Sequence, residues 1–299
     1  MAAADLTTDE ISAFLEMQRV IIECQSKNTP FFIGRLSGNE PNLCSNIFEN
    51  NMPTNYLFNN MLFGAGIQFL SKSDVAEYVK TYTDSFRNCD MVGVWNGGSM
   101  LDQSRGFYSR IYQTPGRAWR PFTATAIEPY YSMNDARYAF DSIFKNKKVL
   151  ILTSHSKTIK SQLPNLAQMF KKPIFHETTQ FFVQKTPQQN GGSHDEHSWK
   201  WHFDKLKTTV ENIKNTFFDF DIALVSCGGF GMPISDYIRT DLGKSVIYVG
   251  GALQLFFGVM GARWEKSDKI QEHVNSFWVR PLEVDRPSNP EYCEQSCYW

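Results

Sequence analysis

The sequence predicts an α/β fold of the Rossmann-like kind, with a mostly parallel sheet and helices on both of its faces. Short apolar runs such as 148–153 and 222–226 are typical of strands that are buried on both sides. A turn of small or polar residues follows each of these runs, and a helical pattern follows the turn. This repeated alternation of strand, turn and helix is typical of a doubly wound sheet.

The expected elements follow one another along the whole chain. Thr7 and Glu10 have the spacing of a capping box and predict a first helix that ends near Gln25. Strands or extended segments are expected at 31–36, 91–95, 118–127, 148–153, 222–226 and 245–249, and a further element begins at Pro173. Further helices are expected from Asn39 and over about 73–89, 159–163, 198–215, 233–242 and 252–259.

Length and composition favour one large domain. The chain has 299 residues, of which 42% are hydrophobic and 14% aromatic, which is ample for a sizeable core. We expect a single α/β domain over 1–279. Residues 280–299 are rich in Pro, Ser and Asn, and we expect them to form a tail packed on or near that domain.

Charge and targeting signals restrict the partners. The formal net charge is -1, so the chain has no long-range field to collect nucleic acid or an anionic membrane. The first residues lack a secretory signal, and no stretch approaches the roughly 20 apolar residues of a membrane span. The six cysteines form no CxxC pair, which suits a reducing compartment. The sequence therefore predicts a cytoplasmic protein without a transmembrane segment, and a homodimer is compatible with it.

Three turns that join a predicted strand to a predicted helix have the composition of an anion site. In an open parallel sheet, ligands lie beyond the carboxyl ends of the strands, where helix N-termini present N–H groups. Glycine at such a turn either lets the backbone approach an anion or only relieves a steric conflict, and both interpretations stay open for each turn alone. Together the turns predict a diphosphate site made of Ser154, His155, Ser156, Lys157, Cys227, Gly228, Gly229, Gly231, Gly250, Gly251 and Gln254.

Familiar nucleotide and metal motifs are absent from the sequence. There is no GxGxxG after a strand, since Gly64-Ala65-Gly66 lacks the third glycine, and there is no GxxxxGK[ST]. The Asp219-Phe220-Asp221 pattern precedes a strand, so we interpret it as a turn that leads into that strand. The histidines of the 194–202 region lie in a polar segment without cysteine, which favours a solvated loop over a metal site. Nearby, Trp199 and Trp201 are expected to pack or to form a wall of a ligand site.

Several segments together resemble glycosyltransferases of the GT-D type, a group of bacterial and large-virus proteins. The segments are FIGRLSGNE at 32–40, VLILTSHSKTIK at 149–160, FDIALVSCGGFGMPISDYI at 220–238, GKSVIYVGGALQLFFGVMGARW at 243–264, and the shorter Glu128-Pro129-Tyr130. The resemblance covers most of 30–265 and implies a catalytic domain that binds a nucleotide-sugar.

The segment 35–40 departs from the family pattern at one position. In GT-D enzymes an Arg-Phe-Gly-Asp-Gly-Glu type motif holds a divalent metal on the donor diphosphate through its Asp and Glu. Here Gly38 stands at the Asp position, and Glu40 is the only family-matched carboxylate. A single carboxylate is a poor site for Mn²⁺ or Mg²⁺, which prefer several oxygen ligands. Either the metal is dispensable or other residues complete its shell, and Arg35 and Glu40 could instead form an internal ion pair.

The resemblance and the turns together predict a glycosyltransferase that moves a sugar from a nucleotide-sugar, with UDP preferred, to a glycan acceptor. The candidate catalytic residues are Glu40, His155 and Glu128, as general base or as stabilisers of positive charge. Arg35, Ser37 and Asn39 join the donor-binding set. An NAD-linked sugar oxidoreductase and a non-catalytic nucleotide- or glycan-binding protein are the alternatives. The protein would act in the cytoplasm, which is the host cytoplasm if the source is viral.

Overall fold

The computed structural model describes residues 9–95, 107, 121–187, 190–191 and 194–299. The described residues form one seven-stranded sheet in the order β3-β2-β1-β7-β6-β4-β5, and all of its neighbouring strands are parallel. The predicted α/β Rossmann-like fold is therefore confirmed. The strands are β1 (Phe32–Arg35), β2 (Met91–Val94), β3 (Pro121–Thr123), β4 (Lys148–Thr153), β5 (Gln180–Lys185), β6 (Ile222–Ser226) and β7 (Ser245–Tyr248).

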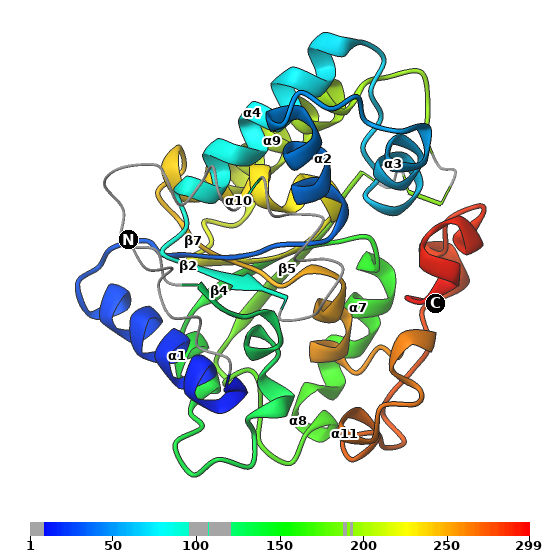
Figure 1. Cartoon of the computed structure of the whole chain (residues 1–299). Helices are drawn as coiled ribbons and strands as arrows, with labels where there is room; N and C mark the ends of the chain where they lie inside the picture. Colours follow the sequence, from blue (N-terminus) through cyan, green and yellow to red (C-terminus); the bar gives the residue numbers. More distant parts are fainter. Residues whose placement is uncertain (1–8, 96–106, 108–120, 188–189, 192–193) are drawn as a thin grey trace.

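Helices cover both faces of the sheet (Figure 1). One face carries α2 (Asn39–Phe48), α4 (Lys72–Arg87), α9 (Trp199–Asn212) and α10 (Gly231–Thr240), with α3 (Asn55–Asn59) beside them. The opposite face carries α1 (Glu10–Ser26), α7 (Ser156–Gln162), α8 (Leu166–Met169) and the 3-10 helix η8 (Gly250–Phe257), with α11 (Asp268–Gln271) at its margin. No helix in this described part is long and apolar enough to cross a bilayer.

Short 3-10 and π-helical turns complete the secondary structure. They are η1 (Asn60–Gly64), η2 (Ala124–Ile127), η3 (Pro129–Tyr131), η4 (Phe140–Phe144), η5 (Leu163–Asn165), η6 (Ile213–Phe217), η7 (Gly228–Phe230), η9 (Ala262–Trp264), η10 (Glu283–Asp285), η11 (Pro290–Tyr292) and η12 (Glu294–Ser296).

The core consists of two layers, one on each side of the sheet. Successive side chains of a strand point to opposite faces, so Ile151 packs in the layer beneath α1 while Leu150 packs in the layer beneath α10. Every residue of β1 is buried, as in a central parallel strand. The continuous apolar runs that predicted these strands are therefore explained by burial on both faces.

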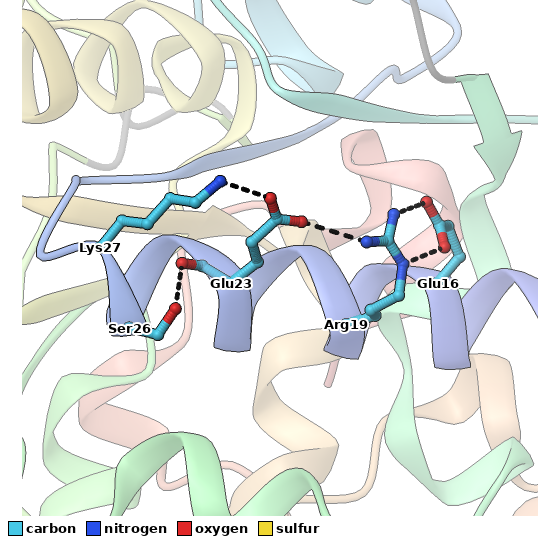
Figure 2. Close-up of polar contacts among 5 residues, drawn as sticks. All are labelled: Glu16, Arg19, Glu23, Ser26 and Lys27. Atoms are coloured by element: carbon cyan, nitrogen blue, oxygen red, sulfur yellow. Dashed lines mark hydrogen bonds and ion pairs between the residues drawn. The ribbon is translucent and has the colours of Figure 1, made fainter.

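The helix α1 shows why an amphipathic sequence folds against the sheet. Phe14, Met17 and Ile21 are buried against the sheet on one side of the helix. On the outer side Arg19 lies between Glu16 and Glu23, with atom separations of 2.7 and 3.1 Å (Figure 2). Exposed pairs of this kind contribute only about 0.3–0.5 kcal/mol each, so the buried face fixes the position of the helix.

Two strands at the centre of the sheet lead to opposite faces. The chain leaves β1 into α2 on one face, whereas it leaves the neighbouring β7 into η8 on the other. The adjacent pair β6 and β4 diverges in the same way, into α10 and α7. Diverging connections open a crevice at the carboxyl ends of the strands, which is where doubly wound proteins bind ligands.

Several predicted boundaries are wrong. The first helix is capped by Asp9, whose carboxylate accepts a 2.7 Å hydrogen bond from the amide of Ser12, so Glu10 is its first helical residue. Thr7 lies outside the described residues. The segment from Pro173 is irregular, and the next regular element is the edge strand β5, where only Val183 is fully buried. A half-exposed edge strand lacks the continuous apolar run that identified the central strands.

Two further segments adopt tighter structure than predicted. In the described part of the expected extended segment 118–127, 121–123 form a strand, and the chain then turns into η2, where Ala124 packs against Gly93. Residues 108–120, like 96–98 after β2, lie outside the described part. The helix expected at 252–259 is the 3-10 helix η8, which ends at Gly258 with a left-handed φ of 62°.

Candidate functional site

A cavity of about 480 Å³ lies at the carboxyl edge of the sheet, at the crevices where the chain diverges. Ligand pockets are typically about 300–1,000 Å³, so the space suits a small molecule. The described residues that line it lie at or follow the ends of all seven strands, and others come from 64–66, from 263–264 and from Glu294, Tyr298 and Trp299. The cavity therefore collects residues from both ends of the chain.

The turn between β1 and α2 forms a continuous part of the cavity wall, through Arg35, Ser37, Gly38, Asn39 and Glu40. β1 ends at Arg35, and α2 begins directly after its N-cap, Gly38. The connection between them is therefore short. The candidate residues of this turn are therefore brought together as the sequence predicts.

Arg35 is a buried cation beside this cavity, with 8% of its surface exposed. Its Nη1 donates to the carbonyl oxygen of Val249 and lies 3.5 Å from Glu128 Oε1, and the guanidinium lies 4.5 Å from the ring centroid of Trp95. The internal ion pair suggested for Arg35 and Glu40 is wrong. The partner is Glu128, which reaches Arg35 from the far side of β2 and β3.

Glu40 is 2% exposed and accepts a hydrogen bond from the hydroxyl of Ser37. Burial raises the pKa of Glu40 from 4.5 to about 7, and the negative charge of Glu294 across the cavity adds to the rise. A carboxyl group with this pKa exchanges protons near neutral pH, as a general base or acid must. Glu40 is thus the group in this turn best suited to proton transfer.

Glu128 has a different environment although it is equally buried. Burial raises its pKa, and the guanidinium of Arg35 and a hydrogen bond from the hydroxyl of Tyr130 oppose that rise. Both partners hold the carboxylate in one orientation. The contacts favour Glu128 as a residue that positions Arg35 and counters its charge.

His155 lines the cavity at the end of β4. Burial lowers its pKa from 6.5 to about 4, so its imidazole is neutral at neutral pH and is a weak base. Its Nδ1 lies 3.3 Å from the hydroxyl of Ser154, and its ring packs on Trp299 with centroids 5.6 Å apart. A hydrogen bond to the backbone of Tyr298 partly opposes this fall in pKa.

The glycines after β6 serve mainly to pack two loops together. The amide of Gly229 donates to Ala65 O at 2.8 Å, and a Cβ at Gly231 would lie 2.1 Å from the ring of Tyr248. The hydroxyls of Tyr248 and Tyr78 donate to the carbonyls of Gly228 and Gly229. Cys227 and Gly228 line the cavity, whereas Gly229 and Gly231 do not. The contacts at those two glycines support the steric interpretation.

The turn between β4 and α7 is only half open to the cavity. Ser154 and His155 line it, whereas Ser156 and Lys157 do not. Asp285 accepts hydrogen bonds from the amides of Lys157 and Thr158 at 3.3 and 2.7 Å. The carboxylate therefore accepts the hydrogen bonds that the amides of this helix N-terminus could have donated to a phosphate.

The turn after β7 is covered by the end of the chain. Gly250 and Gly251 line the cavity, and a Cβ at Gly251 would lie 2.2 Å from the ring of Tyr298. Gln254 is buried outside the lining, and its amide donates to the carbonyls of Val259 and Tyr298. Gln254 thus holds the chain end in place and does not face the cavity.

Five lining residues near the end of the chain were missed: Arg263, Trp264, Glu294, Tyr298 and Trp299. The last three lie in a segment rich in Pro, Ser and Asn, which predicts a surface tail. The aromatic pair Tyr298-Trp299 within so polar a segment was the available signal that this tail returns to the molecule. Gly64-Ala65-Gly66, set aside as an incomplete dinucleotide motif, also lines the cavity.

The other residues that the sequence singled out lie away from the cavity. Trp199 is core, with its ring against Tyr78, and His197 stacks on Trp201 with centroids 3.8 Å apart. Asp219 pairs with Lys244 at 2.6 Å, and Asp221 accepts the amide of Lys148 at 2.8 Å. The two aspartates therefore fix the entrance to their strand, as expected.

The described carboxylates do not form a metal site. Glu40 is bonded to Ser37, Glu128 to Arg35 and Tyr130, and Glu294 to Arg263. Within the described ranges there is no cluster of three or more His, Cys, Asp or Glu residues that could hold an ion. Gly38 at the Asp position of the family motif thus has no substitute among these residues.

No protein-family model, curated protein or solved structure matches this chain significantly.

Proposed function

We propose that this protein is a glycosyltransferase that moves a sugar from a nucleotide-sugar, with a UDP-sugar as the preferred donor, to a glycan acceptor. The observation that supports the proposal most is that Arg35 and Glu40, which do not pair with each other, line the same cavity. Both come from one turn and line one cavity, and one is a buried cation while the other is a carboxyl group with a pKa of about 7. Sugar transfer needs a cation at the departing diphosphate and a base at the acceptor hydroxyl.

Arg35 suits the diphosphate of the donor. A guanidinium carries five N–H donors and binds phosphate through two of them at once. The hydrogen bond to Val249 and the ion pair with Glu128 both use Nη1, so other N–H groups of the guanidinium can serve a ligand. The rings of Trp95, Trp264 and Tyr298 line the same cavity and suit stacking on a base or a sugar.

Glu40 suits the acceptor side of the reaction. The ionised carboxylate would take the proton of the acceptor hydroxyl as its oxygen bonds to the anomeric carbon of the sugar. The bond from that carbon to the diphosphate breaks, and its electron pair leaves with the nucleoside diphosphate. Because the pKa of Glu40 is about 7, a large fraction of the enzyme holds the ionised form at neutral pH. The described carboxylates offer no metal shell, so charge neutralisation at the diphosphate falls to Arg35.

A thermal-shift panel tests donor binding. UDP, GDP, dTDP and NAD are each added with and without Mn²⁺, and the melting temperature is measured. A nucleoside diphosphate at 100 times its dissociation constant should stabilise the fold by about 2.7 kcal/mol. Release of nucleoside diphosphate from the matching nucleotide-sugar, measured with a glycan acceptor, then tests turnover.

The outcomes of this panel separate the proposal from its alternatives. Stabilisation by NAD alone would favour an NAD-linked sugar oxidoreductase and would contradict the proposal. Stabilisation by UDP without turnover of any nucleotide-sugar would favour a non-catalytic binding protein. Binding and turnover of a UDP-sugar together would support the proposal.

A further inference from the structure

Residues 290–299, which we call the strap, form part of the cavity wall. Glu294, Tyr298 and Trp299 from the strap line it. Figure 1 shows this segment in red, beside the carboxyl edge of the sheet, and its Tyr298 packs against Gly251 of η8. The side chain of Glu294 is also 45% exposed, so the strap borders both the cavity and solvent.

Arg263 is one of several residues that join the strap to the cavity wall, since Gln254 and Arg280 also donate hydrogen bonds to the carbonyls of Tyr298 and Trp299. Arg263 also lines the cavity, and its Nη2 forms an ion pair with Glu294 while its Nη1 donates to the hydroxyl of Tyr298 at 3.1 Å. The amide of Arg263 donates to the carbonyl of Cys297 at 2.9 Å. In the described part of the lining, Arg35 and Arg263 are the two arginines, and each is paired with a glutamate.

Two glycines allow the strap to pack closely against the rest of the protein. A Cβ at Gly251 would lie 2.2 Å from the ring of Tyr298, and a Cβ at Gly261 would lie 2.8 Å from the carbonyl oxygen of Cys297. Both distances are too short for a residue with a Cβ, so the strap can pack this closely only because these two positions are glycine. A tail without a fixed position would not need these glycines.

The two ion pairs of the cavity differ in how firmly they are held. The side chains of Arg35 and Glu128 are 10% and 5% exposed, whereas those of Arg263 and Glu294 are 39% and 45% exposed. A pair as exposed as the second contributes about 0.2–1 kcal/mol, because water screens it. Phosphate oxygens form stronger, two-point hydrogen bonds with an arginine than a screened carboxylate does. A diphosphate in the cavity can therefore displace Glu294.

We propose that Arg263 is a second phosphate-binding residue of the cavity, and that Glu294 occupies it as an internal anion until a diphosphate displaces it and releases the strap. This inference rests on the proposed function, because it takes a nucleoside diphosphate as the ligand. Ligand binding and strap opening are then coupled, and the loss of the Glu294 charge favours both.

The affinity test uses inorganic pyrophosphate and UDP as probes, with uridine as the control without phosphate. Glu294→Gln removes the internal anion, so both probes should bind roughly two- to fivefold more tightly while uridine is unaffected. Glu291→Gln, an equal charge change at an exposed strap residue outside the lining, should leave all three affinities unchanged. Arg263→Gln should weaken pyrophosphate roughly 10- to 100-fold, and Arg263→Lys should recover part of that loss.

Hydrogen exchange measures the strap itself. In the wild type, saturating pyrophosphate should speed exchange of the amides at 290–299, and in Glu294→Gln these amides should exchange up to about fivefold faster than in the wild type without ligand. Slower or unchanged strap exchange with bound pyrophosphate would overturn the inference, as would equal affinities in Glu294→Gln and Glu291→Gln. Failure of both phosphate probes to bind the wild type would overturn it too. Phosphate binding that follows this pattern without turnover of any nucleotide-sugar would instead contradict only the proposed enzyme activity.

Discussion

The turns that follow β1 and β4 lie at the same edge of the sheet, and each leads into a helix. The β1 turn faces the cavity along its whole length, from Arg35 to Glu40. The β4 turn opens to the cavity only at Ser154 and His155, because Asp285 occupies the N-terminus of α7. The N-terminus of α7 is thus closed to a ligand by a carboxylate from a distant part of the chain, whereas every residue of the β1 turn lines the cavity.

The largest expected effect lies in the β1 turn. Glu40→Gln keeps the shape of the side chain but removes its proton exchange, so the rate of sugar transfer should fall roughly 10²–10⁴-fold. Affinity for the nucleoside diphosphate should change far less, because Arg35 remains. Turnover and dissociation constant are measured on the same preparation, and a fully active Glu40→Gln protein would remove Glu40 from the chemistry.

A substitution at the β4 turn should lower the stability of the protein and leave the rate of catalysis unchanged. Asp285→Ala leaves the amides of Lys157 and Thr158 and the hydroxyl of Thr158 without their acceptor. The free energy of unfolding should fall by about 2–4 kcal/mol, since buried donors lose hydrogen bonds to a charged group. Denaturant unfolding of Asp285→Ala is compared with that of Glu283→Ala, an exposed neighbour in η10. Equal stabilities of the two variants would show that Asp285 does not hold the α7 turn.

The pH dependence of stability should carry the signature of Glu40. Its pKa in the folded protein is about 7, above the ordinary 4.5, so the folded state binds more protons than the unfolded state between these values. Stability should therefore fall as the pH rises from about 4.5 to about 7 and change little above that. His155 acts oppositely, because its pKa is lowered to about 4, and its contribution is lost as the pH falls from 6.5.

The effect of Glu40 is separated from that of His155 by comparing how the stabilities of the wild type and of Glu40→Gln depend on pH. The difference in stability between Glu40→Gln and the wild type should grow in favour of the variant from about pH 4.5 to about pH 7. Thermal melts across this range provide the measurement. A difference that stays constant with pH would show that Glu40 ionises in the folded protein as freely as in the unfolded chain.

The smallest expected effect is that of removing divalent metal. Since the carboxylates of the described cavity are engaged by Ser37, Arg35, Tyr130 and Arg263, UDP affinity should change less than about twofold on treatment with EDTA. Isothermal titration before and after treatment measures this change. Loss of binding that Mn²⁺ restores would mean that further ligands complete a shell around Glu40.

The sequence was sufficient for the central strands and for the β1 turn. Strands such as β4 and β6 are buried on both faces, so their apolar runs are continuous and bounded by turns. The edge strand β5 was missed because its apolar run is only three residues long, 181–183, and all of its residues except Val183 are partly or fully exposed. Arg35 and Glu40 could be placed together because only four residues separate them on one turn.

The rest of the cavity depends on contacts between distant parts of the chain. Asp285 reaches α7 across 127 residues from Thr158, and Glu128 reaches Arg35 across 93. Neither periodicity nor spacing in the sequence predicts such pairs. Each of these side chains could equally well have been exposed to water. The amides of the β4 turn therefore looked free, and the strap looked like an exposed tail.

The central claim is that the β1 turn, and not the β4 turn, binds the diphosphate. The most direct measurement is UDP affinity in two variants, each checked by its melting temperature. Arg35→Gln combined with Glu128→Gln removes the buried pair without leaving one charge alone, and it should weaken UDP roughly 10- to 100-fold. Lys157→Gln should leave the affinity unchanged, because Lys157 does not line the cavity. A loss of UDP affinity in Lys157→Gln, together with normal binding by the double variant, would show that the β4 turn binds the diphosphate.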